Sequence, residues 1–313
     1  MQLSDRIGRR MKLQDLHVLM TVVQAGSMGK AAQLLNTSQP AISRSIAELE
    51  SAFGIRLLDR SRRGIEPTEY GRALLDCGVA VFDELRRGVK NIEFLDDPAA
   101  GQVRIGTISA LAATFVAPVI DRLSRRYPRV VFHLITEDLP ALHRELNERN
   151  LDLLIVQRFD PFGEKQLDFE ILYDASYVIA ASAGNPWARR RKIRLAELMN
   201  EYWVLPPPES GFGPAAVNAF RASGLDYPRA TVFAAQADAR IRLLKSGRLL
   251  SIFTTSVLTS ATSSDLKVLS VELPMANAPV GIITLKNRKL SPVAQLFANG
   301  ARESARRLSK GKV

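Results

Sequence analysis

Apolar residues in the first part of the chain recur at intervals of three and four, which is the spacing of one face of an α-helix. One predicted helix carries an apolar stripe made of Ile42, Ile46, Leu49 and Phe53. Ser38 suits the N-cap of this helix, Pro40 fits its first turn, and Gly54 ends it. A shorter helix is expected after Ser27, with the pair Ala31–Ala32 on its inner face. Two short helices joined by a polar turn predict a helix-turn-helix.

The face opposite this stripe carries small or hydrogen-bonding side chains close to the start of the helix. They are Gln39, Ser43, Arg44 and Ser45. Gln39 and Arg44 can reach base edges in a major groove, while the hydroxyls of Ser38 and Ser43 suit phosphate oxygens. With Pro40 at the same end, these residues predict a recognition helix for double-stranded DNA.

A short hairpin with a basic tip is expected after the second helix. Residues 56–60 predict one strand, 61–64 the turn and 65–67 the returning strand. Arg62 and Arg63 stand at the tip, where arginine suits the DNA backbone or the negative potential of a minor groove. A charge run alone is usually a solvated surface. The order and short separation of the helices, the turn and the hairpin favour DNA binding instead.

A proline-free stretch from residue 69 to residue 95 predicts one long helix that is capped by Thr68. Its apolar residues follow a heptad spacing and are Leu75, Phe82, Leu85, Val89 and Ile92. Gly78 interrupts this seam. Such a helix can pack on its own domain, but its length and its place between a DNA reader and the next domain favour dimerisation through residues 68–95.

Beyond a hinge at residues 96–101, strands and helices alternate to the end of the chain. The expected strands are Gln102–Ile108, Val130–Thr136, Leu151–Val156, Leu167–Tyr173, Tyr177–Ala181, Tyr202–Leu205, Ala230–Ala234, Leu249–Phe253 and Val280–Leu285. The expected helices are Ala110–Tyr127, Leu139–Arg149, Leu195–Met199, Pro214–Ser223, Asp238–Lys245 and Ser291–Leu308. The order of the first elements predicts a parallel sheet with right-handed crossovers. So long an α/β pattern favours two lobes with a cleft between them.

Ligands of open α/β sheets bind beyond the carboxyl ends of the strands, often against helix N-termini. This rule selects six candidate effector-binding residues, which are Thr107, Ser109, Thr136, Arg158, Ser210 and Phe253. Hydroxyls and one arginine suit a small organic acid or a similar anion. Ordinary capping and turn formation would also account for each of these residues taken alone.

Composition narrows the classes of function. The chain has 313 residues and a formal net charge of +11, which favours a polyanionic partner. Its one cysteine cannot form an intramolecular disulfide, and no apolar run is long enough to span a membrane. The first residues lack the apolar core of a signal peptide, so a bacterial cytoplasm is the expected location.

An enzyme is the main alternative class of function. The three histidines, His17, His133 and His143, have no spacing suited to metal ligation, and the patterns of a nucleophile elbow, a P-loop and a dinucleotide site do not occur. We therefore expect no catalytic residue, metal or cofactor. A solute-binding protein alone would leave the helix-turn-helix unexplained, and a DNA-architectural protein would need no cleft. A regulator with a filled cleft that acts without a small molecule stays open.

The stretch from Ser27 to Gly71 resembles the winged helix-turn-helix of LysR-type transcriptional regulators. The matching positions are Ser27, Ala31–Ala32, Ser38–Ser43, Leu49–Glu50, Phe53–Gly54, Leu57–Arg60 and Pro67–Gly71. Leu58 stands where the family usually has Phe, and Pro67 where it usually has Leu. The resemblance implies an effector domain of two Rossmann-like lobes, in which the chain crosses over and then returns to the first lobe. It also implies a tetramer built as a dimer of dimers.

We therefore expect an α+β multidomain protein with a winged helix-turn-helix at residues 1–67 and a linker and dimerisation helix at 68–97. A two-lobed α/β effector domain, similar to periplasmic binding proteins, is expected at 98–313, with lobe I at about 101–178 and 275–313 and lobe II at about 179–274. The expected function is sequence-specific transcriptional regulation, modulated by a small-molecule effector between the lobes. Effector binding would change the angle between the lobes, and thereby half-site spacing, DNA bend and contact with RNA polymerase. A solute-binding module or an enzyme domain fused to a DNA-binding head is the alternative.

Overall fold

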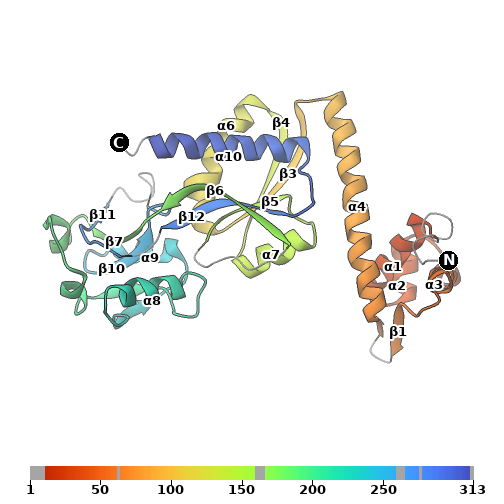
Figure 1. The fold of residues 1–313 in the computed structure, drawn as a ribbon, viewed down its shortest axis with the longest axis horizontal. Coiled ribbons are helices and arrows are strands. Elements are labelled where there is room, and N and C mark those ends of the chain that lie inside the picture. The colour runs from red at the N-terminus through yellow and green to blue at the C-terminus, as the bar shows by residue number, and fades with distance from the viewer. Residues whose placement is uncertain (1–10, 62–63, 159–165, 259–264, 275–276, 311–313) are drawn as a thin grey trace. The chain divides into compact units, whose positions relative to one another are not determined.

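The computed structural model of the chain (Figure 1) describes residues 11–61, 64–158, 166–258, 265–274 and 277–310. The chain divides into two units, Met1–Val89 and Lys90–Val313, and each is described by itself. The division falls within the long helix α4 (Glu69–Asp96). The predicted DNA-binding residues Arg62 and Arg63 lie outside the described residues.

The described residues of the first unit form three short helices, a hairpin and most of α4. These elements are α1 (Leu13–Ala25), α2 (Met28–Leu34), α3 (Gln39–Phe53), β1 (Leu58–Ser61) and β2 (Gly64–Pro67). The two strands pair antiparallel, with Leu58 opposite Pro67, so the predicted helix pair and hairpin are confirmed. The first strand begins two residues later than predicted. One apolar cluster joins the helices and buries Ile46 of α3 with Leu19 and Val22 of α1.

In the second unit, the described residues form two five-stranded sheets, and the first has the strand order β4-β3-β5-β12-β6. Its strands are β3 (Ala100–Thr107), β4 (Arg129–Thr136), β5 (Leu153–Gln157), β6 (Leu167–Ala175) and β12 (Ala278–Leu285). Strand β3 pairs parallel with β4 and with β5, as the predicted order of elements requires. Strand β12, by contrast, pairs antiparallel with β5 and β6. The first lobe is therefore a mixed sheet.

Helices cover both faces of this first sheet. Helices α6 (Ala117–Arg126) and α10 (Pro292–Lys310) pack on one face, and α7 (Leu139–Asn147) packs on the other (Figure 1). Side chains alternate between the faces of a strand, so Leu153 and Ile155 of β5 join the cluster under α6 and α10, while Leu154 joins the cluster under α7. This double burial explains the continuous apolar run of β5.

The second sheet has the strand order β11-β7-β10-β8-β9. Its strands are β7 (Tyr177–Ser182), β8 (Trp203–Leu205), β9 (Ala230–Phe233), β10 (Leu250–Thr254) and β11 (Leu266–Val268), of which β11 is not among the predicted strands. Helices α8 (Gly213–Ala222) and α9 (Ala237–Leu244) pack on its opposite faces. Because β12 returns the chain to the first sheet, the predicted two-lobed fold is confirmed.

The predicted helix Ala110–Tyr127 is present but is not a regular α-helix throughout. It consists of the short α5 (Ser109–Leu111), a π-helical turn at Ala112–Val116 and then α6. Within this segment the Thr114 hydroxyl donates a hydrogen bond to the carbonyl oxygen of Ala110 at 2.8 Å, which competes with the regular helical pattern. Two 3-10 turns, Pro186–Arg189 and Leu195–Leu198, lie between β7 and β8.

Candidate DNA-binding surface and effector cavity

Side-chain caps set the starts of α2 and α3. The Ser27 hydroxyl accepts a hydrogen bond from the N–H of Lys30 at 3.1 Å. The Ser38 hydroxyl accepts one from the N–H of Ala41 at 3.4 Å. Gly54 follows α3 with a φ of 71°, a left-handed conformation that glycine adopts without strain. The predicted caps and the predicted helix end are therefore confirmed.

The start of α3 presents most of the predicted recognition residues to solvent. The exposed ones are Ser38, Gln39, Pro40 and Arg44. Ser43 is half-buried. The prediction that Ser45 shares this face is wrong, because its hydroxyl donates to Oδ1 of the buried Asp15 in α1 at 2.6 Å. Ser45 lies three positions after Ile42 and four before Leu49, so helical geometry places it on the inner side.

Glu50 and Gly71 hold the hairpin against the helices. A carboxylate oxygen of Glu50 accepts hydrogen bonds from the N–H groups of Leu57, at 2.7 Å, and Leu58, at 3.3 Å. Gly71 lies in the first turn of α4, where a Cβ would be 2.1 Å from the carbonyl oxygen of Leu57. Thr68 caps α4 by accepting a hydrogen bond from the N–H of Gly71 at 3.0 Å. Both Glu50 and Gly71 belong to the LysR-like motif. The spacing of this motif does not reveal that they position the hairpin of β1 and β2, which is called the wing below.

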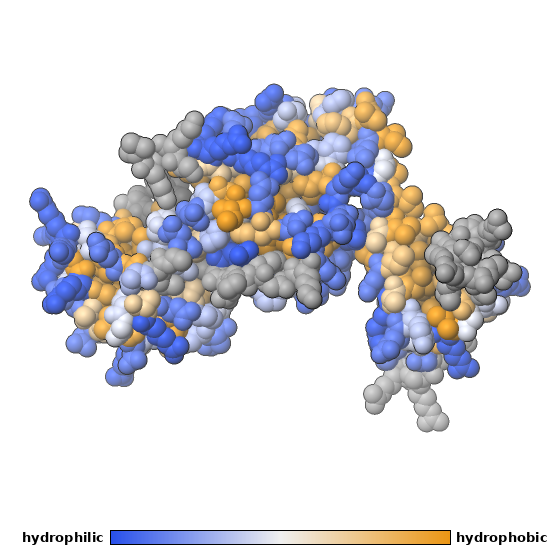
Figure 2. Space-filling model, in the orientation of Figure 1, coloured by the Kyte–Doolittle hydropathy of each residue, from blue (hydrophilic) through white to orange (hydrophobic). Residues whose placement is uncertain are grey.

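The apolar seam of α4 divides into a covered part and an exposed part. At the buried Gly78, a Cβ would lie 3.0 Å from Sδ of Met20 and 3.2 Å from Cδ1 of Leu16. Gly78 is therefore the point at which α1 crosses α4 closely. Figure 2 shows apolar side chains along α4, and the exposed large ones toward its end are Leu85, Val89, Ile92 and Leu95. Val89 and Ile92 keep 54% and 68% of their surface exposed.

A cavity of about 830 Å³ lies between the two lobes of the second unit. Four predicted effector residues contribute to its wall, namely Ser109, Thr136, Ser210 and Phe253. Ser109 and Thr136 stand at the carboxyl ends of β3 and β4, and Phe253 stands near that of β10. The hydroxyl of Ser210 donates to the carbonyl oxygen of Pro207 at 2.7 Å. The rule of strand ends thus selects residues from both lobes that share one cavity.

Two predicted effector residues, Thr107 and Arg158, are not among the described residues that line this cavity. Thr107 is fully buried, and its hydroxyl donates to the carbonyl oxygen of Ile155 at 2.6 Å, which joins β3 to β5. The guanidinium carbon of Arg158 lies 4.6 Å from the centre of the Phe169 ring. The rule of strand ends selects both residues by their position in the chain alone. Their side chains make contacts elsewhere and do not line the cavity.

Arg240 is a charged residue of the cavity wall that is not among the predicted effector residues. It lies on the inner face of α9, is only 2% exposed and donates from Nη1 to the carbonyl oxygen of Ile252 at 2.7 Å. Its guanidinium carbon lies 5.3 Å from the centre of the Phe212 ring and 4.8 Å from that of Phe253. Its buried Nε has no hydrogen-bond acceptor among the described residues. Burial lowers the pKa of Arg240 to about 10, so the side chain is still charged at neutral pH.

Polar contacts join the two lobes around the cavity. The Ser109 hydroxyl of the first lobe donates to Oδ2 of Asp238 in the second lobe at 3.0 Å. Deeper in the cavity, Oε1 of Gln157 accepts hydrogen bonds from the hydroxyls of Thr254, at 2.8 Å, and Ser256, at 3.1 Å. Gln157 ends β5 and Thr254 ends β10, so this buried network connects the strand ends of both sheets. A change in the angle between the lobes would have to rearrange these contacts.

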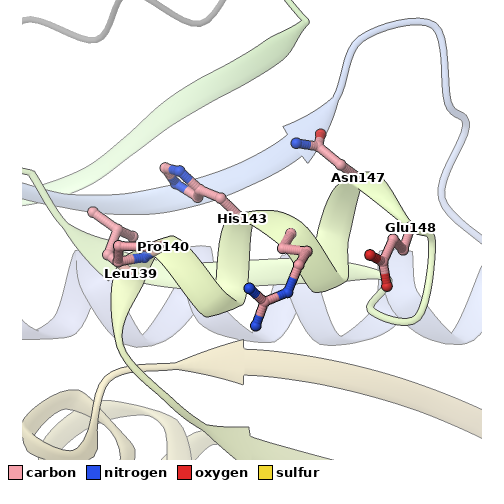
Figure 3. A pocket seen from close by; sticks show the side chains of 6 residues that line it. Leu139, Pro140, His143, Asn147 and Glu148 are labelled. Carbon is pink, nitrogen blue, oxygen red and sulfur yellow. The ribbon is translucent and has the colours of Figure 1, made fainter.

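A second hollow of about 570 Å³ runs along α7. Figure 3 shows His143 and Asn147 on one side of this helix and Glu148 at its end, with Leu139 and Pro140 at its start. All its lining residues belong to α7 or directly follow it, and none is a predicted effector residue. The larger cavity, which is lined from both lobes, is therefore the better candidate for a ligand site.

The described part of the chain shows no group of three or more His, Cys, Asp or Glu side chains that could hold a metal ion. The free cysteine, Cys77, is exposed on α4. In that same part of the chain, no helix combines the length and the apolar character that are needed to cross a membrane.

Two family matches account for the two units. Residues 13–72 match the bacterial regulatory helix-turn-helix protein, lysR family, and residues 96–306 match the LysR substrate binding domain. The chain belongs to the LysR-type transcriptional regulators. It is therefore a DNA-binding transcriptional regulator with an effector-binding domain, and not an enzyme, as the sequence predicts.

Relatives and solved structures agree with this membership over nearly the whole chain. This LysR-type regulator is 26% identical over 289 residues to GbpR of Azospirillum brasilense, covering 91% of this chain and 84% of that protein. Its fold is similar to full-length CbnR in complex with its target DNA, with a TM-score of 0.56, 22% identity and coverage of 94% and 100% of the two chains. A full-length OxyR variant from Pseudomonas aeruginosa gives a TM-score of 0.63 at 21% identity, with 95% of both chains covered.

Proposed function

We propose that this LysR-type regulator reads its operator with the start of α3 and the basic wing, and responds to a small organic anion held between its lobes. The observation that carries the second part is Arg240, a buried cation in the wall of the cavity. No carboxylate among the described residues pairs with it. A ligand anion would supply the missing counter-charge.

The DNA contacts of this proposal come from one helix end and one hairpin tip. The residues are Ser38, Gln39, Pro40, Ser43 and Arg44 of α3 and its cap, together with Arg62 and Arg63 of the wing. Exposure of Arg44 and Gln39 leaves both free to reach base edges, and the N-terminus of α3 suits a phosphate. Glu50 and Gly71 would hold the wing at a fixed place relative to α3.

The effector contacts of this proposal centre on Arg240. Burying a charge with no opposite charge beside it is costly even where, as here, a carbonyl oxygen accepts one of its hydrogen bonds, so such a residue favours a counter-ion in the working state. A carboxylate in the cavity would lie beside the guanidinium, and the rings of Phe212 and Phe253 would keep water away from this pair. Ser109, Thr136 and Ser210 would add polar contacts, whereas Thr107 and Arg158 would act only indirectly.

Self-association is the third part of the proposal. A dimer would form through residues 68–95, where the exposed stripe of α4 includes Leu85 and Val89 at a spacing of four. A tetramer would then be a dimer of such dimers. We further propose a bacterial cytoplasmic location, the domain limits 1–67, 68–97 and 98–313, and contact with RNA polymerase at the promoter.

Ligand binding would act on DNA through the angle between the lobes. An anion at Arg240 would draw α9 and its neighbours toward the first lobe and alter the contacts of Ser109 with Asp238. A changed angle would repack the subunits and shift the spacing of the two recognition helices, and with it the bend of the operator.

The test uses the full-length protein and a metabolite that raises its melting temperature in a thermal-shift screen. We expect this metabolite to change the footprint on operator DNA for the wild type and to have no effect on Arg240→Gln. The variant Arg158→Gln should respond like the wild type. Loss of the response in Arg158→Gln but not in Arg240→Gln would contradict the proposed site. A footprint that no stabilising metabolite changes would contradict effector control.

A further inference from the structure

The charged residues of the cavity wall are distributed unevenly between its depth and its opening. Four carboxylates of the described residues line the cavity, namely Glu137, Asp138, Glu209 and Asp238. Arg240 is the only positively charged side chain among the described residues of the wall. All four carboxylates are exposed, whereas Arg240 is 2% exposed. The cavity therefore has a single positive group at depth and several negative groups toward solvent.

Two of these carboxylates accept hydrogen bonds from uncharged donors within the protein. Asp238 accepts a hydrogen bond from the Ser109 hydroxyl at 3.0 Å, and Asp138 accepts one from the N–H of Ala141 at 2.9 Å. A neutral donor satisfies one oxygen but adds no positive charge. A ligand that carried only negative charge would be attracted by Arg240 and repelled by four groups.

We propose that the effector is a zwitterion of the amino-acid class, with its carboxylate at Arg240 and its cationic nitrogen toward the carboxylates at the opening. This inference rests on the proposed function, in which an anionic group binds Arg240. Phe212 and Phe253 flank the guanidinium, so an apolar side chain next to the carboxylate would contact aromatic surface. The volume of about 830 Å³ lies within the ordinary range of small-molecule sites.

The direct test compares ligands that differ only in charge. The twenty amino acids are screened by thermal shift against the full-length protein, each beside the acid that lacks its α-amino group and the amine that lacks its carboxylate. One such set is L-phenylalanine, 3-phenylpropanoate and 2-phenylethylamine. We expect at least one amino acid to raise the melting temperature and to bind at least ten-fold more tightly than its matched acid and amine. An acid that binds as tightly as its amino acid, or no shift with any amino acid at about 10 mM, would overturn the inference.

Charge variants at the opening test the same point without altering the buried arginine. In Glu137→Gln and Glu209→Gln, we expect affinity for the amino acid to fall about five-fold, as the loss of one nearby opposite charge implies. Affinity for the matched acid should stay the same or rise. Glu272→Gln is the matched control, because Glu272 is exposed and is not among the residues that line the cavity. Equal losses in all three variants would contradict the inference.

The outcomes separate this inference from the proposed function. If the matched acid binds best and Arg240→Gln weakens it, an anion occupies the cavity as proposed and the zwitterion is wrong. If Arg240→Gln leaves the binding of every ligand unchanged, the anion site itself is wrong, and the inference falls with it. Operator binding in the absence of ligand reports on the DNA-binding part independently in both cases.

Discussion

Replacing Gly71 with alanine should destabilise the DNA-binding unit, whereas the same change at Gly78 of the same helix should be nearly neutral. At Gly71 the added Cβ would lie 2.1 Å from the carbonyl oxygen of Leu57 and 3.1 Å from its carbonyl carbon. These atoms are backbone, and the carbonyl oxygen also accepts a hydrogen bond from the N–H of Thr68 at 3.0 Å. The clash can be relieved only if the wing moves away from α4.

At Gly78 the same Cβ would meet the flexible ends of Met20, at 3.0 Å, and Leu16, at 3.2 Å. Overpacking costs about 1–3 kcal/mol, and loss of a hydrogen bond adds about 1 kcal/mol. Alanine favours a helix over glycine by about 1 kcal/mol. At Gly71 the lost hydrogen bond and the helix preference cancel, and the backbone carbonyl of Leu57 cannot yield, so the overpacking cost is at the upper end and the free energy of unfolding should fall by about 2–3 kcal/mol. At Gly78 the flexible ends of Met20 and Leu16 can yield, so the cost is at the lower end, the helix preference offsets it, and the free energy of unfolding should stay within about 1 kcal/mol of the wild type.

Thermal denaturation of the full-length protein, followed by circular dichroism, measures this difference. For a unit of this size, about 2–3 kcal/mol corresponds to a melting temperature lower by roughly 10–20 °C. Operator binding below that temperature reports whether the wing is also displaced. If Gly71→Ala melted with the wild type, or if both variants lost the same stability, the argument that Gly71 fixes the wing would be refuted.

Three further predictions concern base reading, self-association and pH. Arg44→Ala should reduce discrimination between operator and random DNA by about 1–3 kcal/mol in titrations, whereas its neighbour change Ser45→Ala should lower stability and leave discrimination intact. Val89→Asp should weaken the dimer about 10- to 100-fold in sedimentation experiments, because a buried charge would replace an apolar contact. An unchanged dimer would exclude the exposed apolar stripe of α4 as the interface. Hydrogen bonds from Arg302 lower the pKa of Glu170 below its ordinary 4.5, so this pair stabilises the first lobe at neutral pH and the contribution is lost as the pH falls below that value. The difference in melting temperature between the wild type and Glu170→Gln should accordingly narrow in acid, and a constant difference would contradict the assignment.

Local sequence patterns are sufficient to predict the helices of the DNA-binding unit and their ends. Its helices are short, their caps are side chains close by in sequence, and their apolar stripes follow from helical geometry, so Ser38 and Gly54 mark the ends of α3 correctly. Ser45 shows the limit of this reasoning. Local spacing of polar residues assigns Ser45 to the outer face of α3, because its partner, Asp15, lies thirty residues earlier in the chain.

In the effector domain, the residues of the cavity and the direction of strand pairing depend more on contacts between segments that are distant in sequence. The rule of strand ends needs only the order of strands and helices, and it placed Ser109 and Phe253 in one cavity. The rule of strand ends does not select Arg240, because this residue lies on a helix. Its place in the cavity wall depends on the packing of α9 against β10. The apolar pattern of a strand is the same beside a parallel or an antiparallel neighbour. It therefore does not predict that β12 pairs antiparallel with β5.

Sequencing of genomic DNA fragments captured by the purified full-length protein tests the central claim most directly. We expect a small number of sharp sites with dyad symmetry, enriched for the wild type and lost for Arg44→Ala. Diffuse binding that weakens uniformly with salt and is the same for both proteins would contradict it, because general basicity and not the start of α3 would then account for the affinity.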